Sequence, residues 1–100
     1  MDDKYYFARE QFFPAIRILA ASTGDIQSRL IYAYRLILLV RIDDFDHDPE
    51  LKIKFARILD SFSVDKENME ELGSETAAQM TDMAAIKVAD LICDFYGDLG

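Results

Sequence analysis

The sequence has few of the residues that carry reactive chemistry or cross-link a small protein. Its 100 residues include one cysteine, Cys93, one histidine, His47, and no tryptophan. A lone cysteine excludes an internal disulfide and fits a reducing compartment. A cysteine–histidine nucleophile is not expected either, because His47 lies in an acidic segment and Cys93 lies near the end of an expected helix, not at its activating start. At the margin of the core, Cys93 is expected as a small buried thiol.

Long apolar runs are also missing. The longest one, residues 30–42, is interrupted by Arg35 and Arg41 and is shorter than the roughly 20 apolar residues that span a bilayer. Residues 1–6 have neither the basic start nor the apolar stretch of a secretory signal. We therefore expect no membrane association and a cytoplasmic location.

Basic side chains are scarce, and they are unevenly placed. The chain has 11 lysines and arginines against 19 aspartates and glutamates, which gives a net charge of -8. Residues 1–42 carry a net charge of +2, so the remainder carries -10. An acidic second half repels phosphate backbones, so nucleic acid is an unlikely partner and a basic protein is an easier one. The alternative is that the charge only keeps a helical protein soluble.

With two prolines, four glycines and 51% apolar residues, the composition fits one globular domain over residues 1–100. Apolar residues recur at helical spacing, and no segment alternates strictly as a half-buried strand does. We therefore expect an all-α, single-domain bundle of four main helices, to which a short helix over residues 75–80 could be added before the last.

The first two helices are expected on either side of a turn at residues 22–24. The first begins at Asp2 or Asp3 and continues through Pro14, where we expect a kink. Its expected inward positions are Tyr6, Phe7, Phe13, Ile16, Leu19 and Ala20. The second opens at Asp25 and extends to residue 43 or 44.

The other helices have local start and stop signals. Asp48 followed by Pro49 predicts the start of a third helix, which ends at residues 61–63. After the third helix, Gly73 interrupts the helical spacing of apolar residues. Thr81 predicts the start of the last helix, and Gly97 its end. Its expected inward positions are Ala84, Ala85, Val88, Ala89, Leu91, Ile92, Phe95 and Tyr96.

The second helix is apolar on nearly every side. One stripe consists of Leu30, Ala33, Tyr34, Ile37 and Val40, while Tyr32, Leu36 and Leu39 lie towards the opposite side. Aromatic residues are similarly crowded in the first helix, and large exposed apolar patches are rare on monomers. We therefore expect a homodimer, with a candidate oligomer interface of Tyr5, Phe12, Tyr32, Leu36 and Leu39.

The acidic segment 43–50 resembles the start of a calcium loop but does not complete one. Counted from Asp44, Pro49 and Phe55 occupy the positions where such a loop needs glycine and glutamate. We expect no metal and no cofactor. The segment instead belongs to a candidate surface for a protein partner, which comprises Asp43, Asp44, Asp46, Glu50, Glu67, Glu70 and Glu71.

These features favour a non-enzymatic protein–protein interaction module. In size, acidity and helix content the chain is similar to small bacterial immunity or inhibitor proteins, without a motif specific to them. One alternative is a nucleic-acid-associated regulator that uses arginines of the first two helices. However, Arg29, Arg35 and Arg41 spread around their helix, and each is expected to reach a neighbouring carboxylate. Another alternative is an enzyme with a site between subunits.

Overall fold

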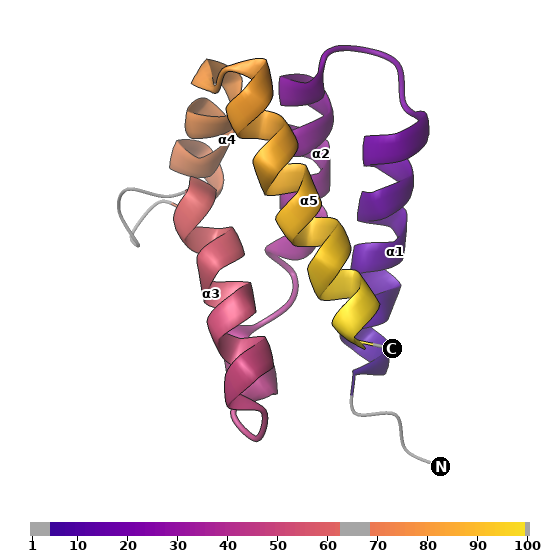
Figure 1. Cartoon of the computed structure of the whole chain (residues 1–100), viewed down its shortest axis with the longest axis vertical. Coiled ribbons are helices and arrows are strands. Elements are labelled where there is room, and N and C mark those ends of the chain that lie inside the picture. Colours follow the sequence, from indigo (N-terminus) through magenta and orange to yellow (C-terminus); the bar gives the residue numbers. More distant parts are fainter. Residues whose placement is uncertain (1–4, 63–68, 100) are drawn as a thin grey trace.

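The computed structural model describes residues 5–62 and 69–99, and of residues 69–72 it describes the backbone alone. These residues form helices and no strand, which confirms the all-α fold (Figure 1). The elements are α1 (Tyr6–Ala21), α2 (Ile26–Ile37), the 3-10 helix η1 (Ile42–Phe45), α3 (Pro49–Phe62), α4 (Met69–Gln79) and α5 (Asp82–Leu99). No helix among them has the length and apolar character needed to cross a membrane.

Three of the predicted helix starts, at Asp25, Asp48 and Thr81, are confirmed by their capping hydrogen bonds. The start predicted at Asp2 or Asp3 lies outside the described residues, and α1 begins at Tyr6 without a side-chain cap. A side-chain oxygen of the capping residue accepts from the backbone N–H three residues later, at 2.8 Å for Asp25, 3.4 Å for Asp48 and 3.1 Å for Thr81. At Asp25 this bond also lowers the pKa of the carboxyl group, because it stabilises the charged form. These side chains satisfy donors that a helix start leaves unpaired.

Four phenylalanines from four elements form the centre of the core at one end of the bundle. Phe12 of α1, Phe45 of η1, Phe55 of α3 and Phe95 of α5 have no more than 1% of their area exposed. Their ring centroids are 4.9–6.2 Å apart in the five pairs that contact. Helix α5 crosses the bundle between α1 and α3 (Figure 1) and so places Phe95 at their junction.

Helix α1 is a single helix through Pro14, and of its predicted inward positions Leu19 is buried and Ile16 packs against the core, whereas the other four are exposed. Its buried residues are Ala8, Phe12, Ala15 and Leu19. The predicted core residues Tyr6, Phe7 and Phe13 are exposed over half of their area or more, and Ala20 is exposed as well. The prediction was wrong because it weighted the aromatic rings. The 4-3-4 spacing of the buried set includes two alanines, whose small side chains allow close helix packing.

The second helix ends earlier than predicted. Its stripe of Leu30, Ala33, Tyr34, Ile37 and Val40 is buried as expected, but α2 stops at Ile37 and not at residue 43 or 44. Leu39 donates to the Leu36 carbonyl at 3.1 Å and Val40 to the Ile37 carbonyl at 3.0 Å, which are three-residue turns. The chain then bends into η1, within the expected loop, and η1 buries Phe45.

The short helix expected over residues 75–80 is longer, since α4 begins at Met69, so Gly73 lies inside this helix and does not interrupt it. Gly97, which was predicted to end the last helix, lies inside α5. A methyl group at Gly73 would overlap the ring of Tyr34, which stacks on Phe62 with centroids 4.2 Å apart. Gly73 therefore allows α4 to approach α2 closely. Helix α5 continues past Gly97 because Leu99 is buried in the core.

The exposed side of α5 is wider than predicted. Ala84 and Leu91 were expected to face inwards, but both are exposed. Cys93 is also exposed and not a buried thiol. Partial desolvation and the charges of Asp90 and Asp94 raise the pKa of Cys93, since each disfavours the thiolate.

Candidate functional site

The described part of the acidic surface lies at one end of the bundle. Asp43 and Asp44 in η1, Asp46 after it and Glu50 in the first turn of α3 are all exposed. Asp46 Oδ1 accepts from Lys52 Nζ at 2.5 Å. This bond and the charge of Asp46 raise the pKa of Lys52, with a smaller contribution from Asp43. One lysine therefore offsets part of the negative charge.

The rest of the predicted acidic surface cannot be placed beside it. Glu67 lies outside the described residues, and so do the side chains of Glu70 and Glu71. Among the side chains that are described, no three histidines, cysteines or acidic residues gather as a metal site requires. The candidate partner surface consequently reduces to Asp43, Asp44, Asp46 and Glu50.

Asp48 connects the start of α3 with the start of α1. Its Oδ1 caps α3, and its Oδ2 accepts a hydrogen bond from the Tyr5 hydroxyl at 3.3 Å. The Tyr5 ring also packs against Phe45, with centroids 5.5 Å apart. Tyr5 was predicted for an oligomer interface, but these contacts turn it towards its own chain.

The other predicted interface residues have different exposures. Phe12 is wholly buried between Phe55 and Phe95, so its assignment to a surface is wrong: it cannot reach a second molecule in this fold. Tyr32 is 58% exposed, and the Arg35 guanidinium lies 5.7 Å from its ring centroid. Leu39 is 55% exposed and Leu36 half-buried.

Phe7 extends this apolar surface onto α1. Phe7 and Phe13 are about 240° apart around the helix, and Phe13 lies against Tyr96 of α5 with centroids 6.3 Å apart. Phe7 therefore lies on the other flank, towards α2. Since α1 and α2 run antiparallel (Figure 1), Phe7 and Leu39 are at the same end of the pair. We call Phe7, Tyr32, Leu36 and Leu39 the α1–α2 face.

The arginines of α1 and α2 bind backbone carbonyls where carboxylate partners were predicted. Arg29 Nη1 donates to the Leu19 carbonyl at 2.7 Å, near the end of α1. Arg9 Nη1 donates to the Leu99 carbonyl at 3.0 Å, at the end of α5. Both carbonyls belong to the last turn of a helix, where no intrahelical donor is available and the helix dipole favours a cation.

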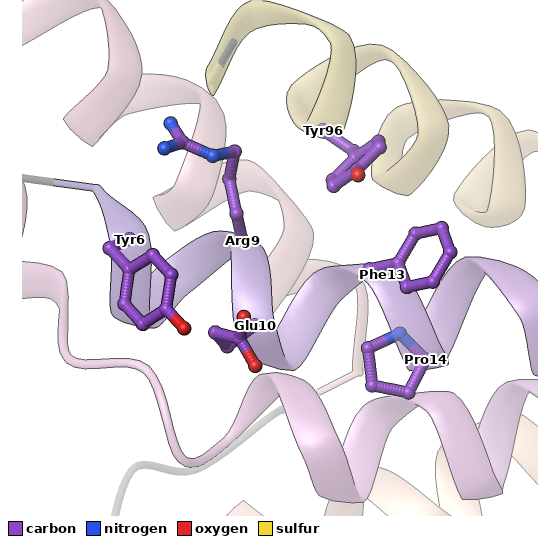
Figure 2. A pocket seen from close by; sticks show the side chains of 6 residues that line it. All are labelled: Tyr6, Arg9, Glu10, Phe13, Pro14 and Tyr96. Atoms are coloured by element: carbon purple, nitrogen blue, oxygen red, sulfur yellow. The ribbon is translucent and has the colours of Figure 1, made fainter. Parts of the chain in front are cut away.

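A groove of about 580 Å³ separates α1 from the end of α5 (Figure 2). The residues that line it, which we call the α1–α5 groove, are Tyr6, Arg9, Glu10, Phe13, Pro14 and Tyr96. The hydroxyl of Tyr6 lies beside the Glu10 carboxylate. A hydrogen bond with Glu10, together with its charge, raises the pKa of Tyr6. Sequence reasoning missed this site because it placed Tyr6 and Phe13 in the core, although their seven-residue spacing puts both on one side of α1.

A smaller hollow of about 210 Å³ lies between α3 and α5, lined by Lys54, Arg57, Leu91, Asp94 and Phe95. Lys54 forms an ion pair with Asp98, which raises the pKa of the lysine. This pair connects the two helices across the hollow.

Comparisons with protein-family models, curated proteins and solved structures found no match to this chain. Its function therefore has to be inferred from the surfaces described above.

Proposed function

We propose that the protein is a non-enzymatic protein–protein interaction module that forms a homodimer through the α1–α2 face. The observation that carries this proposal is the exposure of Phe7 on α1, Tyr32 on α2 and Leu39 in the turn after α2, each over more than half of its area. Exposed aromatic and leucine side chains on neighbouring helices are typical of surfaces that another protein covers. The proposed interface retains Tyr32, Leu36 and Leu39 of the sequence prediction, and Phe7 replaces Tyr5 and Phe12.

The charge distribution supports a second copy of the chain as the occupant of this face. Two chains that each carry a net charge of -8 repel one another when their acidic parts meet. Residues 1–42, which contain α1 and α2, carry a net charge of +2. Pairing through the α1–α2 face therefore keeps the acidic parts apart and reduces this repulsion.

A second surface of the module would bind a basic partner. Asp43, Asp44 and Glu50 are exposed at one end of the bundle, and no ion pair joins any of them to another described residue. Negative groups on one end of a small protein steer a positively charged partner towards it. In this proposal, α3 and η1 present the acidic end while α1 and α2 form the dimer.

The nucleic-acid alternative has less support. Arg9 and Arg29 each bind a carbonyl within the chain, which removes them from the set that could contact phosphates together. No specific observation among the described residues favours an enzyme with a site between subunits. Retention on heparin at low salt would favour the nucleic-acid-associated regulator. Catalytic turnover by the dimer but not by the monomer would favour the enzyme.

A matched pair of substitutions tests the interface. Leu39 and Ile53 are both 55% exposed, but only Leu39 belongs to the α1–α2 face. We expect Leu39→Glu to shift sedimentation velocity profiles towards the monomer, because it places two charges in an apolar interface. Ile53→Glu should leave them unchanged. Equal profiles for both variants, with native helicity by circular dichroism, would mean that the face does not pair.

A further inference from the structure

The α1–α5 groove has aromatic walls on two sides. Tyr6 and Phe13 lie two turns apart on α1, and both are exposed over half of their area or more. Tyr96 faces them from α5, with its ring centroid 6.3 Å from that of Phe13. Figure 2 shows Tyr6 beside Glu10 at one end of the lining and Phe13 beside Tyr96 at the other. Aromatic faces carry partial negative charge and attract a cation that approaches within about 6 Å of a ring centroid.

The two charges of the groove have opposite signs and point in different directions. Two charged residues line it, and Arg9 is already bound to the carbonyl of Leu99 at the negative end of the α5 dipole. In Figure 2 the Arg9 guanidinium extends towards α5, away from Glu10. The carboxylate of Glu10 is exposed and forms no ion pair with a described residue. Glu10 therefore presents its negative charge on the side of the groove away from the Arg9 guanidinium, while its carboxylate also takes part in the hydrogen bond with Tyr6.

The backbone adds a further acceptor. Pro14 lies inside α1 and has no N–H, so the carbonyl of Glu10 lacks the donor that an α-helix normally supplies four residues later. A carbonyl without its usual helical donor can accept from a ligand with N–H donors, such as an ammonium or guanidinium group, but not from one that carries only methyl groups.

The groove is close to the acidic end of the bundle. Tyr5, the residue before Tyr6, donates a hydrogen bond to Asp48 at the start of α3. The end of α5 is tied to α3 through the ion pair of Asp98 with Lys54. The starts of α1 and α3 and the end of α5 thus meet at this end (Figure 1). A basic partner drawn to the acidic residues would arrive beside the groove.

We propose that the α1–α5 groove binds a cationic side chain, a lysine or arginine, of a basic partner protein. The rings of Tyr6, Phe13 and Tyr96 contact its alkyl chain and its charged head. The Glu10 carboxylate accepts from its N–H donors. The basic protein partner in this inference rests on the proposed function. The preference of the groove for a cation does not depend on dimer formation.

Two small probes of similar shape test the groove directly. Nα-acetyl-lysine methylamide and Nα-acetyl-norleucine methylamide share an alkyl chain, but only the first carries an ammonium group. We expect the lysine probe to shift the ring proton resonances of Tyr6, Phe13 and Tyr96 in a saturable way, and the norleucine probe to bind more weakly. Equal binding of both probes, or shifts confined to other residues, would overturn the proposal.

Matched charge variants test the role of Glu10. Glu75 is also exposed, on α4, so Glu75→Gln removes a similar charge away from the groove. We expect Glu10→Gln to weaken binding of the lysine probe roughly two- to fivefold, as exposed ion pairs and cation–π contacts do. Glu75→Gln should leave it unchanged. An equal loss in both variants would show that only net charge matters and would contradict a site at Glu10.

The result also separates this inference from the proposed function. Leu39 lies outside the groove, so a monomer produced by Leu39→Glu should bind the lysine probe as the wild type does. Loss of probe binding with an intact dimer would overturn the groove alone. Probe binding by a wild-type protein that is monomeric would overturn the homodimer alone.

Discussion

Asp48 holds two helix starts together with its two carboxylate oxygens. One carboxylate oxygen caps α3, and the other accepts from the hydroxyl of Tyr5, so Asp48 joins the starts of α1 and α3. Asp46 has the same chemistry two residues earlier, but it is exposed and is bound only to the flexible head of Lys52. The two aspartates therefore allow a structural role to be compared with a solvated one.

We predict that Asp48→Ala lowers the free energy of unfolding by about 0.5–2 kcal/mol, the usual cost of losing a helix cap. Asp46→Ala should cost less than about 1 kcal/mol, since exposed ion pairs contribute little. Urea unfolding followed by circular dichroism measures both. If Asp46→Ala proved the more destabilising change, the acidic segment would hold an ordered interaction that these contacts do not account for.

At the scale of single residues, the sequence predicts helix caps well. It predicts poorly which of two adjacent apolar residues is buried. The signals at Asp25, Asp48 and Thr81 are local, because each cap needs only the three residues that follow it. Phe12 and Phe13 are equally apolar, yet one is buried and the other exposed. Which of them turns inwards depends on where the other helices lie, and that information is not local.

At the scale of elements, the glycines in α4 and α5 differ in the space around them, because Gly73 is closely packed and Gly97 is not. The ring of Tyr34 occupies the space where a side chain at Gly73 would lie, whereas nothing is within 4 Å of a methyl group at Gly97. In the sequence Gly73 indicates an interruption of the helical pattern and Gly97 a helix end. Only the packing of α4 against α2 distinguishes them, so the extent of these helices could not be predicted locally.

We predict that Gly73→Ala destabilises the protein, because the added methyl group forces Tyr34 or α4 to move. Gly97→Ala should be neutral or stabilising by up to about 1 kcal/mol, since alanine has the higher helix propensity. Thermal unfolding of the two variants measures the difference. Stabilisation by Gly73→Ala would mean that α4 does not pack closely on Tyr34.

The early end of α2 is a further feature that the local sequence does not reveal. Residues 38–41 contain neither glycine nor proline, and their apolar character continues the helical pattern. The turn is explained by burial of Phe45, which joins the aromatic core only if the chain bends before η1. A tertiary contact therefore ends the helix where propensity would extend it.

At the scale of the whole molecule, charge is unevenly distributed, whereas exposed apolar side chains are not confined to one part of the chain, since Ile53, Met83, Ile86 and Leu91 are exposed as well. The α1–α2 face combines three large exposed apolar side chains with the least acidic part of the chain. The acidic end and the α1–α5 groove lie outside that face. The sequence predicted the uneven charge of its two parts and the apolar character of residues 30–42, but it did not predict which aromatic residues of α1 would be exposed.

The central claim is that two copies pair through the α1–α2 face, and the mass of the wild-type protein in solution tests it most directly. Light scattering at increasing protein concentration should report twice the mass of one 11.5 kDa chain at micromolar concentration and above. Dilution should return the mass towards that of one chain, because homodimer formation depends on concentration. The mass of a single chain at every concentration would contradict the account.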